Sequence, residues 1–232
     1  MTNRPSSFIA PHKGLRLLFA DVLVLAGRTD PGDATVLSDL LAKMRVLFLL
    51  LELHADDENA VILARLDERL PDAGDHDRGD HERLEALQAR LHKVIEAIER
   101  SPTAVHLDAL YTGLQELFAQ HLLHMREEET VTQLRLWQMF SDAELSGMRA
   151  TFMARLGPER SLLWLTWILP ALRSEEARPL LNGVLAGPDD AFRERALSAV
   201  RKAVGPVRWA AMINTGDPVT GSTNGSSFSF NA

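Results

Sequence analysis

The chain has 232 residues, of which 46% are hydrophobic, enough to bury one sizeable core or two small ones. Its formal net charge is −7, with lysine and arginine interleaved among acidic residues, which argues against a nucleic acid as partner. The absence of cysteine excludes disulfides, thiolate metal sites and thiol nucleophiles. Residues 1–13 lack the apolar segment of a signal peptide, and the apolar run 46–51 is too short to span a bilayer. We therefore expect a cytoplasmic protein that has no membrane partner.

Apolar periodicity predicts a succession of amphipathic helices after a polar N-terminal arm at residues 1–11. The expected helices cover residues 12–27, 34–70, 81–100 and 102–140, and each carries apolar residues at spacings of three and four. Short polar segments separate them, and Asp80 is expected to cap the third helix. The pattern predicts an all-α fold, an antiparallel four-helix bundle spanning residues 8–156.

The C-terminal third of the chain has a different sequence pattern from the four long helices predicted before it. Ser141 and Glu144 have the spacing of a capping box, which predicts a fifth helix that ends near residue 156. Glycine–proline pairs then divide the chain into short helices that carry tryptophan, and we expect residues 157–213 to form a helical extension packed on the bundle. Such an extension could contact a second copy of the chain or a protein partner. Residues 214–232 are rich in glycine, serine, threonine and asparagine and are expected to be a disordered tail.

Six polar side chains interrupt the apolar stripes of the predicted helices. They are His12, His54, Glu58, His81, His124 and Glu128. Two pairs are four residues apart, so on a helix each pair shares one face. In an up-and-down bundle all six fall towards the same end. Burying imidazoles and carboxylates without partners would cost several kcal/mol, and a metal ion could satisfy them together.

The chemistry of these donors limits the choice of metal. Imidazole and carboxylate without thiolate suit iron, manganese or zinc rather than calcium. Two carboxylates can bridge a pair of irons while histidines fill the terminal positions, although a single ion is an alternative. Because the ligands must be neutral imidazoles, affinity should fall as pH drops through the histidine range near about 6.5.

The ordered set resembles the hemerythrin-like (HHE cation-binding) family over roughly residues 8–140. The resemblance rests on His12 followed by Lys13-Gly14-Leu15-Arg16, His54-x-x-x-Glu58, Asp80-His81, and His124-x-x-Glu127-Glu128. It implies a four-helix bundle with a non-haem di-iron centre and roles in O2 binding, sensing, or iron and nitric-oxide handling. The family's oxygen carriers supply one histidine more than the four found here, and His76 and His121 are the weaker candidates for that position.

Several functions compete. The leading hypothesis is a di-iron protein that binds O2 or another small oxidant for sensing, storage or delivery, with an enzymatic role left open as the less favoured alternative. A second is a redox enzyme on the same scaffold that reduces peroxide or nitric oxide. A third is a metal-free helical interaction module. Any one of these histidines taken alone would more often be a hydrogen-bonded structural residue, so the hypothesis depends on the set.

Overall fold

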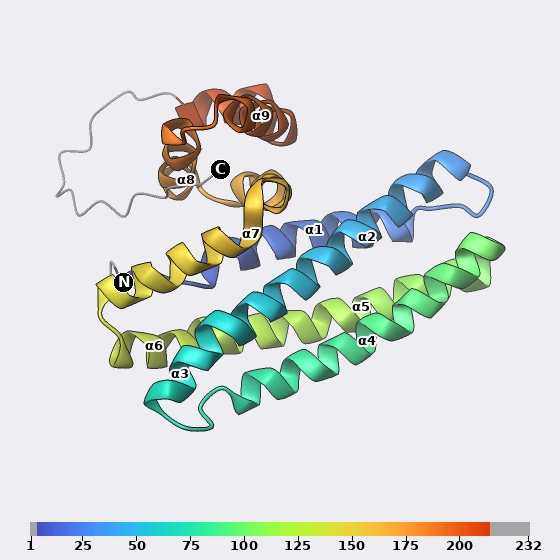
Figure 1. Ribbon diagram of the computed structural model, residues 1–232. Coiled ribbons are helices and arrows are strands. Elements are labelled where there is room, and N and C mark those ends of the chain that lie inside the picture. The colour runs from blue at the N-terminus through green and yellow to red at the C-terminus, as the bar shows by residue number, and fades with distance from the viewer. Residues whose placement is uncertain (1–3, 214–232) are drawn as a thin grey trace. The chain divides into compact units, whose positions relative to one another are not determined.

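The structure is a computed structural model that describes residues 4–213, and every regular element in that range is helical (Figure 1). The prediction of an all-α fold is confirmed. The elements are α1 (Ile9–Gly27), α2 (Ala34–Asp57), η1 (Glu58–Leu63), α3 (Ala64–Arg69), α4 (Asp75–Arg100), α5 (Ala104–Glu127), η2 (Glu128–Thr132), α6 (Gln133–Met139), α7 (Asp142–Ala171), α8 (Ser174–Ala186) and α9 (Asp190–Ile213). No helix in the described range is long and apolar enough to cross a membrane. The tail predicted at residues 214–232 lies outside the described residues.

Packing divides the chain into two units. Within the described range, residues 15–140 form one, here called the long-helix unit, and residues 4–14 with 141–213 form the other, the C-terminal unit. Helix α1 begins in the C-terminal unit and continues into the long-helix unit from Leu15. The division differs from the sequence-based boundary between residues 156 and 157, which falls at a kink in α7.

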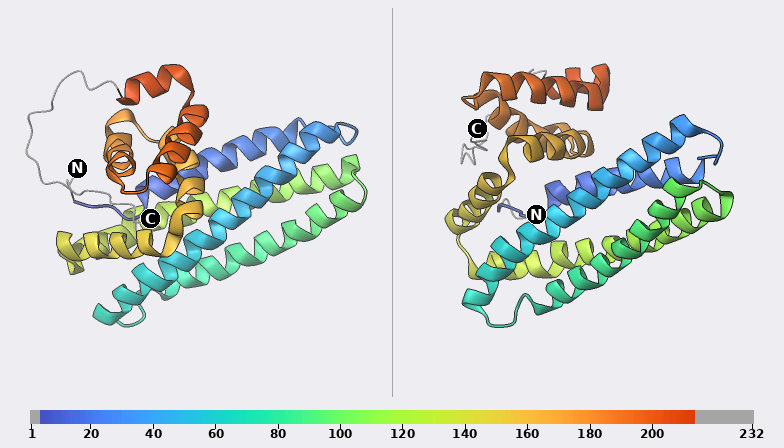
Figure 2. Two further views of the ribbon diagram at one scale, coloured as in Figure 1. Left: turned by 45° about the horizontal axis from the view of Figure 1, so that its top comes forward. Right: turned by 45° about the vertical axis from the view of Figure 1, so that its right-hand side comes forward.

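Four long helical stretches make up the long-helix unit. They are α1 from Leu15, α2–η1–α3, α4, and α5–η2–α6, and they lie alongside one another in all views (Figures 1 and 2). Their inner faces carry the predicted stripes, so that Leu18, Leu47 and Leu114 are completely buried. Burying one such side chain contributes about 1.5–3 kcal/mol to folding.

Helices α4 and α5 approach closely at Gly113. A Cβ added there would lie 2.7 Å from Leu91 Cδ2, so a larger residue at this position would require the Leu91 side chain to move. The close approach matters because α4 and α5 both carry residues of the polar cluster described below.

Two predicted helix starts are wrong. Helix α4 begins at Asp75 and not after Asp80, because Gly79 is accommodated inside it and the first turn holds Asp75 and Asp77, which favour the positive end of the helix dipole. Helix α1 begins at Ile9, so the predicted loose arm is shorter than residues 1–11. The predicted capping box at Ser141 and Glu144 is confirmed at the start of α7.

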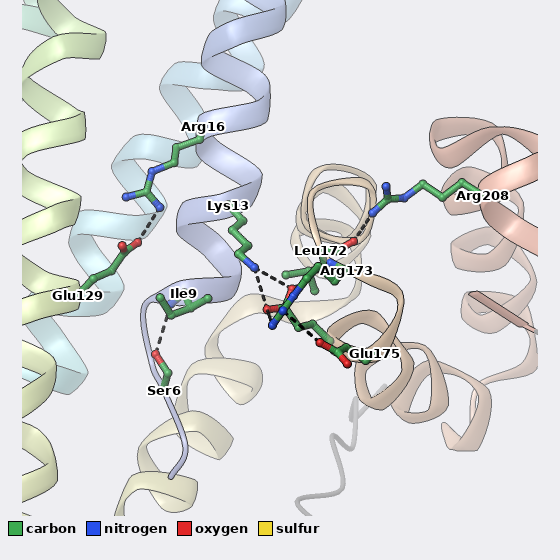
Figure 3. Close-up of polar contacts among 10 residues, drawn as sticks. Ser6, Ile9, Lys13, Arg16, Glu129, Leu172, Arg173, Glu175 and Arg208 are labelled. Carbon is green, nitrogen blue, oxygen red and sulfur yellow. Dashed lines mark hydrogen bonds and ion pairs between the residues drawn. The ribbon is translucent and has the colours of Figure 1, made fainter. Parts of the chain in front are cut away.

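The C-terminal unit has a core of its own. Leu165, Leu169, Leu180 and Val200 are among its buried residues, drawn from α7, α8 and α9. Gly157 and Gly205 have positive φ angles of 64° and 76°, each followed by proline, and they bend α7 and α9. The start of α1 is tied to this unit by Lys13, whose ammonium contacts the Glu176 carboxylate at 2.7 Å; Figure 3 shows Lys13 beside α8.

Candidate metal centre

A histidine and a glutamate lie one helical turn apart where α2 meets η1. His54 stands on the last turn of α2 and Glu58 is the first residue of η1. The His54 Nε2 atom lies 3.2 Å from Glu58 Oε1, and the two residues are 9% and 2% exposed. Their four-residue spacing places both on the buried face, as the sequence predicted.

The same arrangement occurs where α5 meets η2. His124 is on the last turn of α5, Glu128 is the first residue of η2, and His124 Nε2 lies 3.3 Å from Glu128 Oε2. His124 is 4% exposed and Glu128 is fully buried. The two His-x-x-x-Glu pairs are therefore placed alike on two different helices.

Each of these glutamates begins a π-helical turn. The Ala64 amide donates to the Asn59 carbonyl and the Gln133 amide to the Glu128 carbonyl, five residues back instead of four. Such turns are rare and occur frequently at functional sites. Periodicity at 3.6 residues did not reveal them, because it assumes a regular helix.

His81 of α4 lies between the two glutamates. Its Nε2 atom is 3.4 Å from Glu58 Oε2 and 3.8 Å from Glu128 Oε1. Its ring meets that of His124 edge to face, with centroids 4.7 Å apart. Three stretches of the long-helix unit thus direct side chains to one buried point.

The cluster contains two overlapping sets of close ligand atoms. Glu58, His81, His124 and Glu128 each offer an atom within 4.8 Å of the others, and so do His54, Glu58 and Glu128. Both glutamates belong to both sets. A buried group of this kind could hold a metal ion.

Neighbouring side chains orient two of the imidazoles. His81 Nδ1 lies 2.9 Å from the Asn59 amide oxygen, so it donates there as N–H and leaves Nε2 free to act as a ligand. His124 Nδ1 lies 3.4 Å from Asp80 Oδ2. Asp80, predicted as a helix cap, thus lies within α4 and holds a histidine of the cluster.

The donors fit a transition metal on two grounds. All are nitrogen or carboxylate oxygen, the ligand types that iron, manganese and zinc accept. His81 Nε2 is also buried and makes no hydrogen bond with any described residue. Buried polar atoms normally have a partner, and a metal ion would supply one here.

The glutamates perturb the acid–base behaviour of His81. Burial disfavours its imidazolium, but attraction to the close carboxylates of Glu128 and Glu58 outweighs burial and raises the pKa of His81 to about 10. The metal-free site therefore holds a proton on His81 at neutral pH.

The two weaker candidates lie in different surroundings. The His76 side chain is 61% exposed and its Nε2 is 3.8 Å from Asp80 Oδ2, so the structure does not bring it into the cluster. His121 is 6% exposed, with Nδ1 3.0 Å from the Leu117 carbonyl. Burial lowers the pKa of His121 to about 4, so it is neutral. It belongs to neither set of close ligand atoms.

His12 belongs to the C-terminal unit by packing. It is completely buried near the start of α1 and stacks on Phe8, with ring centroids 5.6 Å apart. Its role as a metal ligand stays a prediction.

Asp77 is a buried residue beside the cluster that sequence reasoning missed. It is 1% exposed on α4, one turn before His81, and Thr132 of η2 donates to its Oδ2 at 2.8 Å. Burial raises its pKa, and the Thr132 hydrogen bond only partly offsets this. Its Oδ1 accepts no hydrogen bond from any described residue. The residue escaped notice because α4 was expected to begin four residues later.

Asp77→Asn is expected to stabilise the metal-free protein by about 1 kcal/mol, since the amide oxygen can still accept from Thr132 while a buried ionisable group is lost. Urea unfolding at neutral pH measures the change. Asp75→Asn is the matched control on the same helix, with a side chain 68% exposed, and should alter stability by no more than about 0.5 kcal/mol. A clear loss of stability in Asp77→Asn would contradict this reading of the site.

A scan of the chain against protein-family models, a search of curated proteins and a search of solved structures each returned no match.

Proposed function

We propose that this chain is a hemerythrin-like, non-haem di-iron protein that binds O2 or a related small oxidant for sensing, storage or delivery. The observation that carries the proposal is the sharing of Glu58 and Glu128 by two sets of close ligand atoms. Shared carboxylates are what two adjacent metal ions need as bridges, whereas a single ion would need only one set.

In this proposal the two sets serve two ions. His81 and His124 would hold one ion and His54 the other, and both glutamates would be available to both. Iron supplies the reversible binding of O2 or a similar small molecule. The protein's own part is to hold the imidazoles by Asn59 and Asp80, and to keep the ligand atoms away from bulk water.

The four stretches of the long-helix unit are proposed to act as an antiparallel four-helix bundle, with α1 completing the ligand set. Phe19 of α1 lies against the His121 ring, with centroids 5.1 Å apart, so this face of α1 looks towards the histidines of α5. His12 precedes Phe19 by seven residues, two turns along the same face. We therefore propose His12 as a further metal ligand.

The test is metal loading under anaerobic conditions. Protein incubated with Fe(II) and desalted is expected to hold about two irons per chain, and to develop a near-ultraviolet charge-transfer band on exposure to air. His76→Ala should behave as the unchanged protein, because His76 is exposed and outside the cluster. An iron content near zero, with no band in air, would contradict the proposal and favour a metal-free module.

A further inference from the structure

A cleft in the long-helix unit leads from the surface to the cluster. It has a volume of about 400 Å³ and is formed by residues of α2, η1, α4 and α5. Its lining includes three histidines of the cluster, namely His54, His81 and His124. Of these, His81 presents a buried Nε2 atom that makes no hydrogen bond with the described residues. The cleft therefore ends at a buried nitrogen that a metal ion could bind.

The walls of this cleft are acidic. Its carboxylates are Glu52, Asp56, Glu82 and Glu85, all on exposed positions. Glu52 is fixed across the cleft by Gln88, whose amide nitrogen donates to it at 2.9 Å.

The arginine of the lining, Arg78, does not offset the charges of these four carboxylates. Its guanidinium is engaged by Asp67 and, at 3.0 Å, by Asp75, and neither of these acids lines the cleft. The lining therefore presents four exposed carboxylates to a molecule that enters, and the charge of Arg78 is already paired with acids outside the cleft.

A second cleft reaches His124 from the other side of α4, and its charge is different. It has a volume of about 620 Å³, and its carboxylates Asp80, Glu116 and Glu127 are matched by Arg83, Arg90 and Arg126. Arg90 contacts Glu116 at 3.3 Å, and Arg83 contacts Asp80. Its charges cancel, so it exerts little net attraction on a cation.

We propose that the acidic cleft, the one walled by Glu52, Asp56, Glu82 and Glu85, is the route by which a divalent cation enters the buried cluster. Carboxylates around a cleft with low-dielectric walls raise the local concentration of cations and so accelerate their binding. The neutral second cleft offers no such attraction and leads to fewer of the histidines. The inference rests on the proposed metal binding, but it concerns the rate and path of loading and not the final occupancy.

Stopped-flow binding of Co(II), followed by its visible absorption, tests the route. The variant Asp56→Asn/Glu82→Gln/Glu85→Gln removes three cleft carboxylates at exposed positions, and Glu52 is left in place because it bonds Gln88. We expect its association rate at low salt to fall about tenfold. The difference should shrink at about 1 M salt, where charges are screened within a few ångströms. The dissociation rate should change far less.

A matched control removes the same charge elsewhere. Asp30→Asn/Glu96→Gln/Asp108→Asn also alters exposed carboxylates and shifts the formal net charge from −7 to −4, as the cleft variant does. Its association rate should stay within about twofold of the unchanged protein.

The outcomes separate the two proposals. If the unchanged protein binds Co(II) at equilibrium but the cleft variant loads as fast as the control, the acidic route is wrong. If Glu116→Gln/Glu127→Gln selectively slowed Co(II) association, the second cleft would be the entrance. That result would also contradict the proposed acidic route. If the unchanged protein binds no Co(II) at equilibrium, the proposed metal centre fails and the entry route with it. Circular dichroism of each variant confirms that a slow rate does not reflect misfolding.

Discussion

If the proposed di-iron centre exists, Glu128→Gln is expected to abolish the binding of both metal ions, whereas His54→Ala and His81→Ala should each abolish the binding of one. Glu128 belongs to both sets of close ligand atoms, while each of the two histidines belongs to a single set. Loss of a shared carboxylate should lower the affinity of each position by at least about 100-fold, since even residues that merely orient a ligand contribute 10–100-fold. Metal analysis after desalting, together with calorimetric titration, measures stoichiometry and affinity for each variant.

The neighbouring Glu127 supplies the control. It lines the second cleft and belongs to neither set, so Glu127→Gln should retain two ions. Equal losses in Glu128→Gln and His81→Ala would point to a single ion, and retention of two ions in Glu128→Gln would remove the basis of the di-iron proposal.

Metal affinity is expected to keep rising with pH well above neutrality. A ligating imidazole must give up its proton, and the glutamates raise the pKa of His81 from 6.5 to about 10. Between these two values every ion bound at this position displaces one proton, so affinity should increase by about tenfold per pH unit. The sequence alone predicts that metal affinity declines as pH drops through the ordinary histidine range. With the raised pKa of His81, the decline is expected to begin at higher pH. Calorimetry in buffers of different ionisation enthalpy counts the protons released, and a value near zero at pH 8 would contradict the prediction.

The pKa shifts of His81 and His121 make the stability of the metal-free protein depend on pH. Because the folded pKa of His81 lies above its unfolded value, its contribution is complete below pH 6.5 and is lost as pH rises towards about 10. His121 has a folded pKa of about 4, below its unfolded value, so stability falls as pH drops from 6.5 towards 4. As far as these two histidines are concerned, stability is greatest near pH 6.5, which thermal melts across pH can check.

The features that follow from regular helical periodicity could be predicted from the sequence. The apolar stripes through Leu47 and Leu114 place whole helices, because an amphipathic face must be buried whatever its exact partners. The same stripes placed His54 and Glu58 on a buried face, and their burial is what the structure shows. Apolar periodicity predicts that these residues are buried, but it does not indicate whether they bind a metal or which metal they bind.

The features that were missed depend on local backbone geometry. Asp77 and the true environment of Asp80 were hidden because Gly79 was interpreted as a break before α4, although the turn is held in place by packing against α5 and η2. Asn59, which orients His81, lies in η1, a π-helical turn that a 3.6-residue periodicity does not predict. In a sequence, a glycine near a helix start resembles a loop, and a π turn resembles ordinary helix. Only tertiary contacts show which structure forms.

The π turns have a consequence for comparing this chain with others. Each inserts one residue into an otherwise continuous helix at a glutamate of the buried cluster, at Glu58–Leu63 and Glu128–Thr132. A relative whose corresponding helices are regular would match the residues on both sides only if a gap of a single residue were opened in each. An alignment that forbids such gaps would place either the glutamate or the apolar residues after it out of register, and would conceal a shared site.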